Sequence, residues 1–317
     1  MVTRREPPTH DPLHLSRACV ALVACTLLLA ACAPRVPTSD PRHAAHGARD
    51  TIGQDRTAQY SPGCSASDAW PLPERLVVSE RDRTFIIDPP RDLSAAPHDL
   101  VIAFHGRTND AAQARDYFEV DEAMPNAWIV YPQALPAGPG AFAWSDPGDP
   151  IDAQRDFAFV AAIVDAIGAT RCVDLDRVFA VGHSLGASFA NDLACHTTDL
   201  VRAVATVAGG LQGDACVART AALLLHHPDD QLVPISAGEH ARDAFLAGNG
   251  LQLAHAASVS QPALAVLHCE RVGDAGTPHP VVWCSHDGAT WSSGRYDPHG
   301  WPTGAAAAIA AFFSALP

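Results

Sequence analysis

The sequence predicts an α/β fold in which a mostly parallel central sheet carries helices on both faces. Short runs of nearly continuous apolar residues recur along the chain, as is typical of strands that are buried on both faces. Stretches with apolar residues at helical spacing separate these runs. The chain has 317 residues, 48% of them hydrophobic and 18% charged, so it can bury the core that such a fold needs.

The predicted strands are the apolar runs at 83–88, 100–104, 127–131, 177–181, 201–207 and 221–225. Helical spacing predicts helices over 152–170, 187–195, 236–246 and 305–316. Clusters of proline and glycine at 136–140 and 147–150 indicate loops. No long insertion interrupts the chain between Ser184 and Asp230, so we expect no large lid over this part of the fold.

The N-terminus has the pattern of an export signal. Arg4, Arg5 and Arg17 precede an apolar run, 18–31, that is shorter than the ~20 residues needed to span a bilayer. The run ends in Leu-Ala-Ala-Cys, which resembles a bacterial lipobox in which Cys32 is acylated and becomes the mature N-terminus. An ordinary small-residue cleavage site is the alternative.

These patterns predict three parts: a lipoprotein signal peptide over 1–31, a flexible tether over 32–62 and a folded domain over 63–317. The tether is rich in Pro, Ala, His, Asp and Thr and has no apolar periodicity. We therefore expect an exported protein whose only membrane contact is the lipid at Cys32, in the outer membrane or cell envelope. Without that lipid, the protein would be secreted.

Nine cysteines are present, of which Cys19 and Cys25 leave with the signal peptide and Cys32 carries the lipid. An even set in an exported chain predicts three disulfides. The remaining six are Cys64, Cys172, Cys195, Cys216, Cys269 and Cys284. Of the possible pairings we predict only Cys269 with Cys284, because both lie in neighbouring apolar segments; buried free thiols are the alternative.

The charge and the histidine spacing exclude some classes of partner. A formal net charge of −14 disfavours a surface that binds polyanions, so nucleic acid is not an expected partner. His226 and His227 are adjacent, which suits a single metal ion poorly. We expect neither a metal nor a cofactor.

The segment 182–186 reads Gly-His-Ser-Leu-Gly and joins the predicted strand 177–181 to the predicted helix 187–195. In this context G-x-S-x-G is typical of the nucleophile turn of the α/β-hydrolase fold, in which small residues flank a sharp bend. Ser184 is the predicted nucleophile, and the backbone N–H of Leu185 is a predicted oxyanion donor. The alternative is a small-residue turn that only packs strand on helix.

A serine nucleophile needs a base and an acid that orients the base, in the chain order Ser, Asp, His. Asp230 follows the predicted strand 221–225 and is the expected acid; Asp229 is the alternative, and both residues also suit a turn. His299 lies in a late loop before the last helix and is the expected general base.

The second oxyanion donor is expected after the strand 100–104, where the sequence continues His-Gly-Arg-Thr. We predict the backbone N–H of Arg107, with Gly106 allowing the close approach. The Arg107 side chain either contacts a polar substrate group or is exposed to solvent. Other histidines, namely His183, His226 and His227, are expected near the site without acting in it.

Together these residues resemble the secreted polyhydroxybutyrate depolymerase and feruloyl esterase group of α/β-hydrolases. The matching motifs span residues 103 to 302: AFHGRTND at 103–110, YPQAL at 131–135, RDFAFVAAIVDAI at 155–167, CVDLDRVFAVGHSLGASFANDLAC at 172–195, HHPDDQLVP at 226–234 and YDPHGWP at 296–302. The resemblance implies Ser184, Asp230 and His299 as a catalytic triad. The relatives often have His-Gly or His-Asn at 226–227 and a glycine-rich approach at 297–298, differences that bear on the shape of the pocket.

The expected activity is that of a serine ester hydrolase acting on small or polymeric carboxylic esters. The alternatives are a serine peptidase of the same fold and a lipoprotein that binds ligands without catalysis. Four tryptophans either present an aromatic surface to the substrate or pack in the fold, the more frequent role: Trp144, Trp283, Trp291 and Trp301.

Overall fold

The computed structural model describes residues 58–66, 71–146, 148–149, 152, 154–213, 215–274, 276–290 and 294–317. The predicted signal peptide, Cys32 and most of the predicted tether lie outside the described residues, as does Trp291. Within the described ranges, no helix combines the length and the apolar character needed to cross a membrane.

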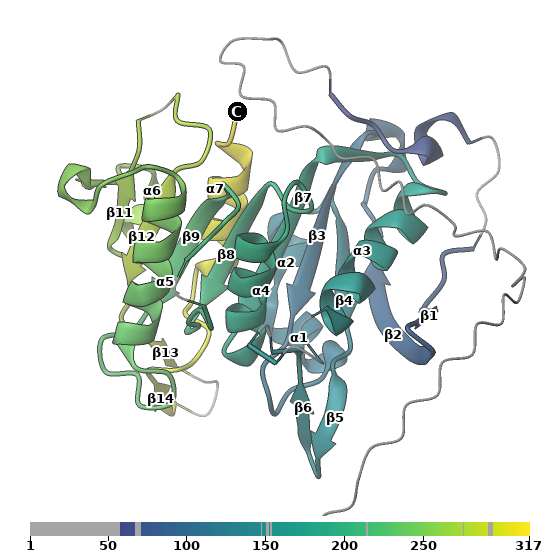
Figure 1. Ribbon diagram of the computed structural model, residues 1–317. Helices are drawn as coiled ribbons and strands as arrows, with labels where there is room; N and C mark the ends of the chain where they lie inside the picture. The colour runs from purple at the N-terminus through teal and green to yellow at the C-terminus, as the bar shows by residue number, and fades with distance from the viewer. Residues whose placement is uncertain are drawn as a thin grey trace, which may run out of the picture. The chain divides into compact units, whose positions relative to one another are not determined.

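A ten-stranded sheet with the order β1-β2-β4-β3-β7-β8-β9-β12-β11-β10 forms the centre of the fold (Figure 1). The six inner strands pair in parallel: β4 (Trp128–Pro132), β3 (His98–Phe104), β7 (Val173–His183), β8 (Ala203–Val207), β9 (Ala221–His226) and β12 (Val281–Ser285). Antiparallel strands border them: β2 (Arg81–Asp88), β1 (Arg75–Val78), β11 (Cys269–Val272) and β10 (Ala257–Ser258). The mostly parallel sheet is confirmed.

Helices cover both faces of the sheet, also as predicted. On one face lie α3 (Arg155–Gly168), α4 (Leu185–His196) and α5 (Ile235–Gly248), which stand in front of the sheet in Figure 1. The other face carries α1 (Ala111–Phe118), α2 (Val120–Ala123), α6 (Pro262–Ala265) and α7 (Ala305–Ser314). Strand residues alternate between the two cores: Leu100 and Ile102 pack on the first, and Val101 and Ala103 on the second.

Among the described residues, the short elements outside the main sheet are three 3₁₀ helices, at Pro62–Ser65, Leu93–Ala95 and Leu253–His255, and two separate two-stranded hairpins. One hairpin joins β5 (Leu135–Gly138) to β6 (Ala141–Ala143), and the other joins β13 (Ala289–Thr290) to β14 (Tyr296–Asp297). The predicted loop over 136–140 is therefore partly wrong, because the chain pairs with itself on either side of the turn. Both hairpins lie at the same end of the fold (Figure 1).

Three disulfides link the six predicted cysteines, and the predicted pair Cys269–Cys284 is confirmed. These two cysteines lie opposite each other in the register of β11 and β12. Cys64 pairs with Cys172 just before β7. Ser61, two residues before the expected start of the folded domain, donates its N–H to the Val173 carbonyl over 2.9 Å.

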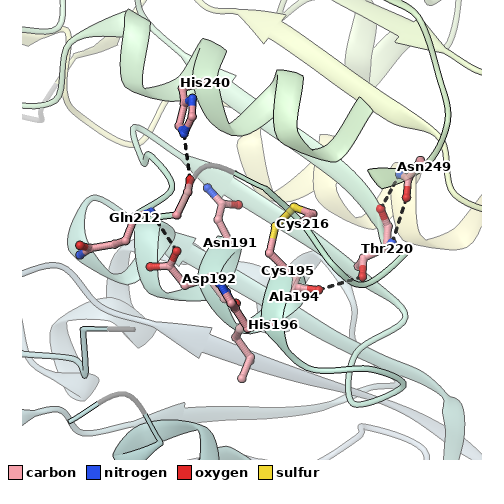
Figure 2. The surroundings of a disulfide bond; sticks show 12 residues. Asn191, Asp192, Ala194, Cys195, His196, Gln212, Cys216, Thr220, His240 and Asn249 are labelled. Carbon is pink, nitrogen blue, oxygen red and sulfur yellow. Dashed lines mark hydrogen bonds between the residues drawn. A yellow bond between two sulfur atoms is a disulfide. The ribbon is translucent and has the colours of Figure 1, made fainter. Parts of the chain in front are cut away.

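The third disulfide fastens the loop between β8 and β9 to α4 (Figure 2). Cys195 on α4 is bonded to Cys216 of the loop. The Gln212 N–H donates to the Asp192 carboxylate over 2.9 Å, and the Asn191 side-chain amide donates to the Gly210 carbonyl over 2.8 Å. Because α4 begins directly after Ser184, these contacts also stabilise the helix that carries the predicted nucleophile.

Candidate active site

The turn between β7 and α4 places Ser184 in a backbone conformation with φ 57° and ψ −123°. Residues other than glycine rarely adopt this conformation. The Ser184 N–H donates to the Val207 carbonyl over 3.0 Å and so ties the turn to β8. A Cβ atom on Gly182 would overlap the backbone of Gly186, and one on Gly186 would overlap the Phe104 carbonyl. Both glycines are therefore required by close backbone contacts.

Ser184, His299 and Asp230 lie within hydrogen-bonding distance in one chain of contacts. The His299 Nε2 atom is 2.8 Å from the Ser184 Oγ, and its Nδ1 atom is 2.7 Å from the Asp230 Oδ2. Ser184 and His299 are half-buried, whereas Asp230 is buried. The structure thus brings together three residues that stand 115 and 69 positions apart in the sequence.

The carboxylate of Asp230 is held by the turn that follows β9. Its Oδ1 atom accepts hydrogen bonds from the backbone N–H groups of Leu232 and Val233, over 2.8 and 3.0 Å. Burial raises the pKa of Asp230, but hydrogen bonds from His299 and from the Val233 N–H outweigh burial and leave this pKa below its ordinary value. The charged carboxylate can therefore orient the imidazole. The alternative acid, Asp229, is exposed, and no hydrogen bond between it and His299 is found among the described contacts.

The two predicted oxyanion donors border the nucleophile. Leu185 is the first residue of α4, so its N–H has no carbonyl one turn earlier in that helix. A Cβ atom on Gly106 would lie 3.3 Å from the Ser184 Cβ, which places the loop after β3 directly beside the serine. Arg107 follows in this loop. Its carbonyl accepts a hydrogen bond from the Phe142 N–H of β6 over 2.8 Å, and its side chain is exposed.

A buried histidine, His105, stabilises the loop after β3 that contains Gly106 and Arg107. His105 lies 2.8 Å through Nδ1 from the Gly106 carbonyl, and its Nε2 atom accepts a hydrogen bond from the Ala134 N–H over 3.1 Å. Since a carbonyl cannot donate, Nδ1 carries the hydrogen. Because Nε2 accepts a hydrogen bond, the ring is neutral, and burial favours this form by lowering the pKa of His105.

The three histidines expected near the site contact its loops rather than the Ser184 hydroxyl. His183 bonds to the main chain of His299 over 2.7 Å, and His226 donates to the Val233 carbonyl over 2.8 Å. The His227 Nδ1 atom accepts the Asp229 N–H, so its Nε2 atom carries the hydrogen and donates to the Tyr296 hydroxyl oxygen over 2.6 Å. Sequence reasoning did not single out Tyr117, whose hydroxyl lies 2.9 Å from His183, because no local pattern marks a contact across 66 residues.

The described tryptophans pack against other rings. Trp144 is buried and stacks on Phe189, while Trp301 stacks on Phe118 with ring centroids 4.3 Å apart. Trp283 stacks on His226. Packing, the alternative to an aromatic substrate surface, thus accounts for these three rings.

Two other apolar side chains are exposed close in sequence to the site residues. Leu232, two residues after Asp230, is 75% exposed, and Tyr296, three residues before His299, is 53% exposed. Among the described residues, no three acidic, histidine or cysteine side chains are grouped so that they would hold a metal ion.

Comparison with known proteins gives both sequence relatives and structural neighbours. No protein-family model matches the chain. Feruloyl esterase C of Emericella nidulans is 28% identical over 239 residues, which cover 72% of this chain and 82% of that protein. Poly(3-hydroxyalkanoate) depolymerase C of Paucimonas lemoignei is 30% identical over 158 residues, which cover 48% of this chain and 37% of the depolymerase.

Among solved structures, a Bacillus cereus carboxylesterase superposes with a TM-score of 0.51 at 13% identity, over 73% of this chain and 93% of its own. A thermostable esterase has the same TM-score at 16% identity, over 76% of this chain and 60% of its own. Together with the mostly parallel sheet and its flanking helices, these neighbours show the α/β-hydrolase fold.

Proposed function

We propose that this chain, a carboxylic ester hydrolase related to the feruloyl esterases and the poly(3-hydroxyalkanoate) depolymerases, cleaves its substrates by acyl transfer through Ser184, His299 and Asp230. The observation that carries the proposal is the position of His299, whose two ring nitrogens lie 2.8 Å from the Ser184 hydroxyl and 2.7 Å from the Asp230 carboxylate. This is the arrangement that a serine needs in order to lose its proton as it attacks.

In the first step His299 takes the proton of Ser184 while the serine oxygen attacks the carbonyl carbon of the ester. Asp230 holds the imidazole in the tautomer that leaves Nε2 free to accept that proton. The N–H groups of Leu185 and Arg107 stabilise the negative charge on the carbonyl oxygen, and one such donor contributes about 10²–10³-fold in rate.

In the second step the proton held by His299 passes to the departing alcohol, and the acyl group stays on Ser184. Water then enters, gives a proton to His299 and attacks the acyl carbon. The acid is released as the proton returns to the serine oxygen. Each bond that forms on the acyl carbon is matched by one that breaks, so no further reactant is required.

The substrates that we propose first are esters of aromatic or short acyl groups, such as methyl ferulate. The similarity to feruloyl esterase C extends over most of both chains, whereas the similarity to the depolymerase covers 37% of that protein. Leu232 and Tyr296 offer exposed apolar surface within three residues, in sequence, of Asp230 and His299. The depolymerase relative supports hydroxybutyrate oligomers as the second class of substrate.

Export is part of the same proposal. Three disulfides are characteristic of proteins that fold in an oxidising compartment, which supports the predicted signal peptide over 1–31. The proposed lipid on Cys32 rests on the lipobox-like sequence Leu-Ala-Ala-Cys alone.

Replacement of the proposed nucleophile tests the activity. We expect Ser184→Ala to abolish hydrolysis of p-nitrophenyl butyrate and labelling by a fluorophosphonate probe, with an unchanged circular dichroism spectrum. Activity retained by this variant would refute the assignment. A panel of methyl ferulate, hydroxybutyrate oligomers and a peptide anilide identifies the substrate class and separates an esterase from a peptidase of the same fold.

A further inference from the structure

The main chain of His299 is bonded to a side chain next to the nucleophile. His183 directly precedes Ser184, and its Nε2 atom lies 2.7 Å from the His299 carbonyl oxygen. On its other side, the His183 Nδ1 atom lies 2.9 Å from the Tyr117 hydroxyl at the end of α1. We call these two residues the Tyr117–His183 brace.

We propose that the Tyr117–His183 brace positions the general base against the nucleophile, and that the rate of acyl transfer depends on it. The inference rests on the proposed function, in which His299 is that base. Neither residue of the brace is assigned contact with substrate, so both are positioning residues.

Chemistry allows the hydrogens of the brace only one arrangement. The His299 carbonyl cannot donate, so the hydrogen between it and His183 is carried by Nε2. Burial lowers the pKa of His183 to about 4, so above that pH the ring is neutral and Nδ1 has no hydrogen. Nδ1 therefore accepts a hydrogen bond from the Tyr117 hydroxyl, whose pKa is raised by burial. The Tyr117 hydroxyl thus stabilises the Nε2–H tautomer of His183, which is the tautomer that donates to the His299 carbonyl.

The backbone N–H and the backbone carbonyl of His299 are both hydrogen-bonded, but to different parts of the fold. The His299 N–H donates to the Asp297 carboxylate over 3.1 Å, which is a contact within the loop itself. The bond from His183 instead ties the loop to β7, the strand that leads into the serine. Since His183 and Ser184 are consecutive residues, a single hydrogen bond couples the position of the base to that of the nucleophile.

The surroundings of the brace keep water away. His183 is 8% exposed, and its ring packs edge-on against both Tyr117 and Trp301. Trp301 in turn stacks on Phe118, the neighbour of Tyr117. If the hydroxyl of Tyr117 is removed, the packing remains and only the hydrogen bond is lost. Tyr117→Phe is therefore a specific probe of the brace.

The experiment measures kcat and KM for p-nitrophenyl butyrate in four variants of the full chain: Tyr117→Phe, His183→Leu, His183→Gln and the double variant Tyr117→Phe/His183→Leu. We expect Tyr117→Phe to lower kcat about 3- to 10-fold, the effect of one net hydrogen bond. His183→Leu should lower kcat on the order of 100-fold, as expected for a displaced catalytic group. KM should change less than about 2-fold in either variant, because the contacts that we assign to substrate binding stay in place.

Two comparisons separate positioning from a loss of packing. The side-chain amide of His183→Gln can donate to the His299 carbonyl, so this variant should recover most of the activity that His183→Leu loses. Because Tyr117 acts through His183, the double variant should be as slow as His183→Leu alone. If the two effects multiply instead, Tyr117 does not act through His183 and the brace is refuted.

A matched control is Tyr131→Phe. Tyr131 is a buried tyrosine of β4, and among the described residues its hydroxyl has no hydrogen-bond partner. The same chemical change at this position should leave kcat unaltered. A kcat loss in Tyr131→Phe equal to that of Tyr117→Phe would count against the brace.

Nitrogen-15 spectra of the wild-type imidazoles provide a readout that does not depend on the variants folding. His183 should remain a neutral Nε2–H tautomer between pH 5.5 and 8.5, and a charged ring or an Nδ1–H tautomer would overturn the inference. The proposed function fails separately: in that case the wild-type protein neither hydrolyses the ester nor reacts with the fluorophosphonate probe. Wild-type activity together with an unimpaired Tyr117→Phe variant would refute the brace alone.

Discussion

At Ser184 the backbone has a positive φ, and this costs of order 1–3 kcal/mol when the residue is not glycine. The turn persists because the Ser184 N–H is bonded to Val207 and because Gly182 and Gly186 leave no side chain to clash. The conformation directs the hydroxyl away from β7 and toward the His299 imidazole. Local strain is thus maintained where it serves the proposed nucleophile.

The adjacent acids Asp229 and Asp230 provide a residue-scale test of the proposed acid. In Asp230→Asn the side-chain oxygen can still accept the N–H groups of Leu232 and Val233, but the amide stabilises neither the required tautomer of His299 nor its positive charge. We expect kcat to fall about 10⁴-fold. Asp229→Asn, an identical change on an exposed side chain, should stay within about 2-fold of wild type. Equal losses in the two variants, measured by ester hydrolysis, would contradict the assignment.

The site could be predicted in part because its members follow local signals. Ser184 stands in a five-residue motif, and Asp230 and His299 stand where the chain order of the fold requires them. The sequence favoured Asp230 but left Asp229 open as the alternative, since the side chains of two adjacent acids in a turn differ only in the direction in which they point. In the structure, the contact with His299 and the backbone N–H groups that face Asp230 distinguish them.

At the scale of elements, α4 contains a buried carboxyl group with an unusual affinity for protons. Asp192 is 1% exposed, and burial, together with the negative charge of Asp146, raises its pKa to about 7. The Gln212 N–H that donates to Asp192 opposes this change without cancelling it. Asp192 lies in the group of contacts that fastens the β8–β9 loop to α4 (Figure 2).

This carboxyl makes stability depend on pH in a defined direction. Its pKa is higher in the folded than in the unfolded chain, so the folded state is favoured most below about pH 4 and loses that advantage as the pH rises through about 7. Asp192→Asn removes the charge and leaves an oxygen for the Gln212 N–H. We expect the unfolding free energy of this variant, measured relative to wild type, to rise by about 2 kcal/mol as the pH is raised from 5 to 8. Urea denaturation at the two pH values measures the gain, and a pH-independent difference would show that Asp192 does not titrate in this range.

Most of the inner strands of the sheet were predicted, but β12 was missed although it is apolar and largely buried. The strands β3, β4, β7, β8 and β9 are nearly continuous apolar runs and lie within a few residues of their predicted bounds. The edge strands β1 and β10 lack that signal, because their side chains are exposed or half-buried. The helix α1 was also missed, although Asp110 and Gln113 form a capping box that marks its start in the sequence.

The β5–β6 hairpin was beyond local reasoning for a different reason. Its prolines and glycines indicate a loop, and Gly138 and Gly140 do take positive φ values at the turn. A contact distant in sequence helps to hold it, since the Phe142 N–H is bonded to the Arg107 carbonyl. Pairing of this kind leaves no periodic trace in the sequence.

At the scale of the whole folded part, the three disulfides close loops of very different length. The cysteines are separated by 108 positions in Cys64–Cys172, by 21 in Cys195–Cys216 and by 15 in Cys269–Cys284. A longer closed loop restricts the unfolded chain more, so replacing both cysteines of the first pair with serine should cost about 4–5 kcal/mol. The same change in Cys269–Cys284 should cost about 3 kcal/mol. Guanidinium denaturation of the two variants tests the order, and a larger loss from the shorter loop would contradict the loop-entropy account.

For the full chain, we predict that Cys32 is the mature N-terminus and carries lipid. In a bacterial host that processes lipoproteins, the wild-type chain should fractionate with membranes, incorporate labelled palmitate and begin at Cys32. Cys32→Ser should lose the label and leave the membrane fraction, because the acyl chains are the only membrane contact we propose. Its kcat should be unchanged, because position 32 is far in sequence from the site residues. Cys25→Ser, inside the segment that is removed, is the matched control and should behave as wild type. Membrane association that survives Cys32→Ser would mean that another part of the chain binds the membrane, whereas an unmodified mature N-terminus at a different residue would favour ordinary signal cleavage.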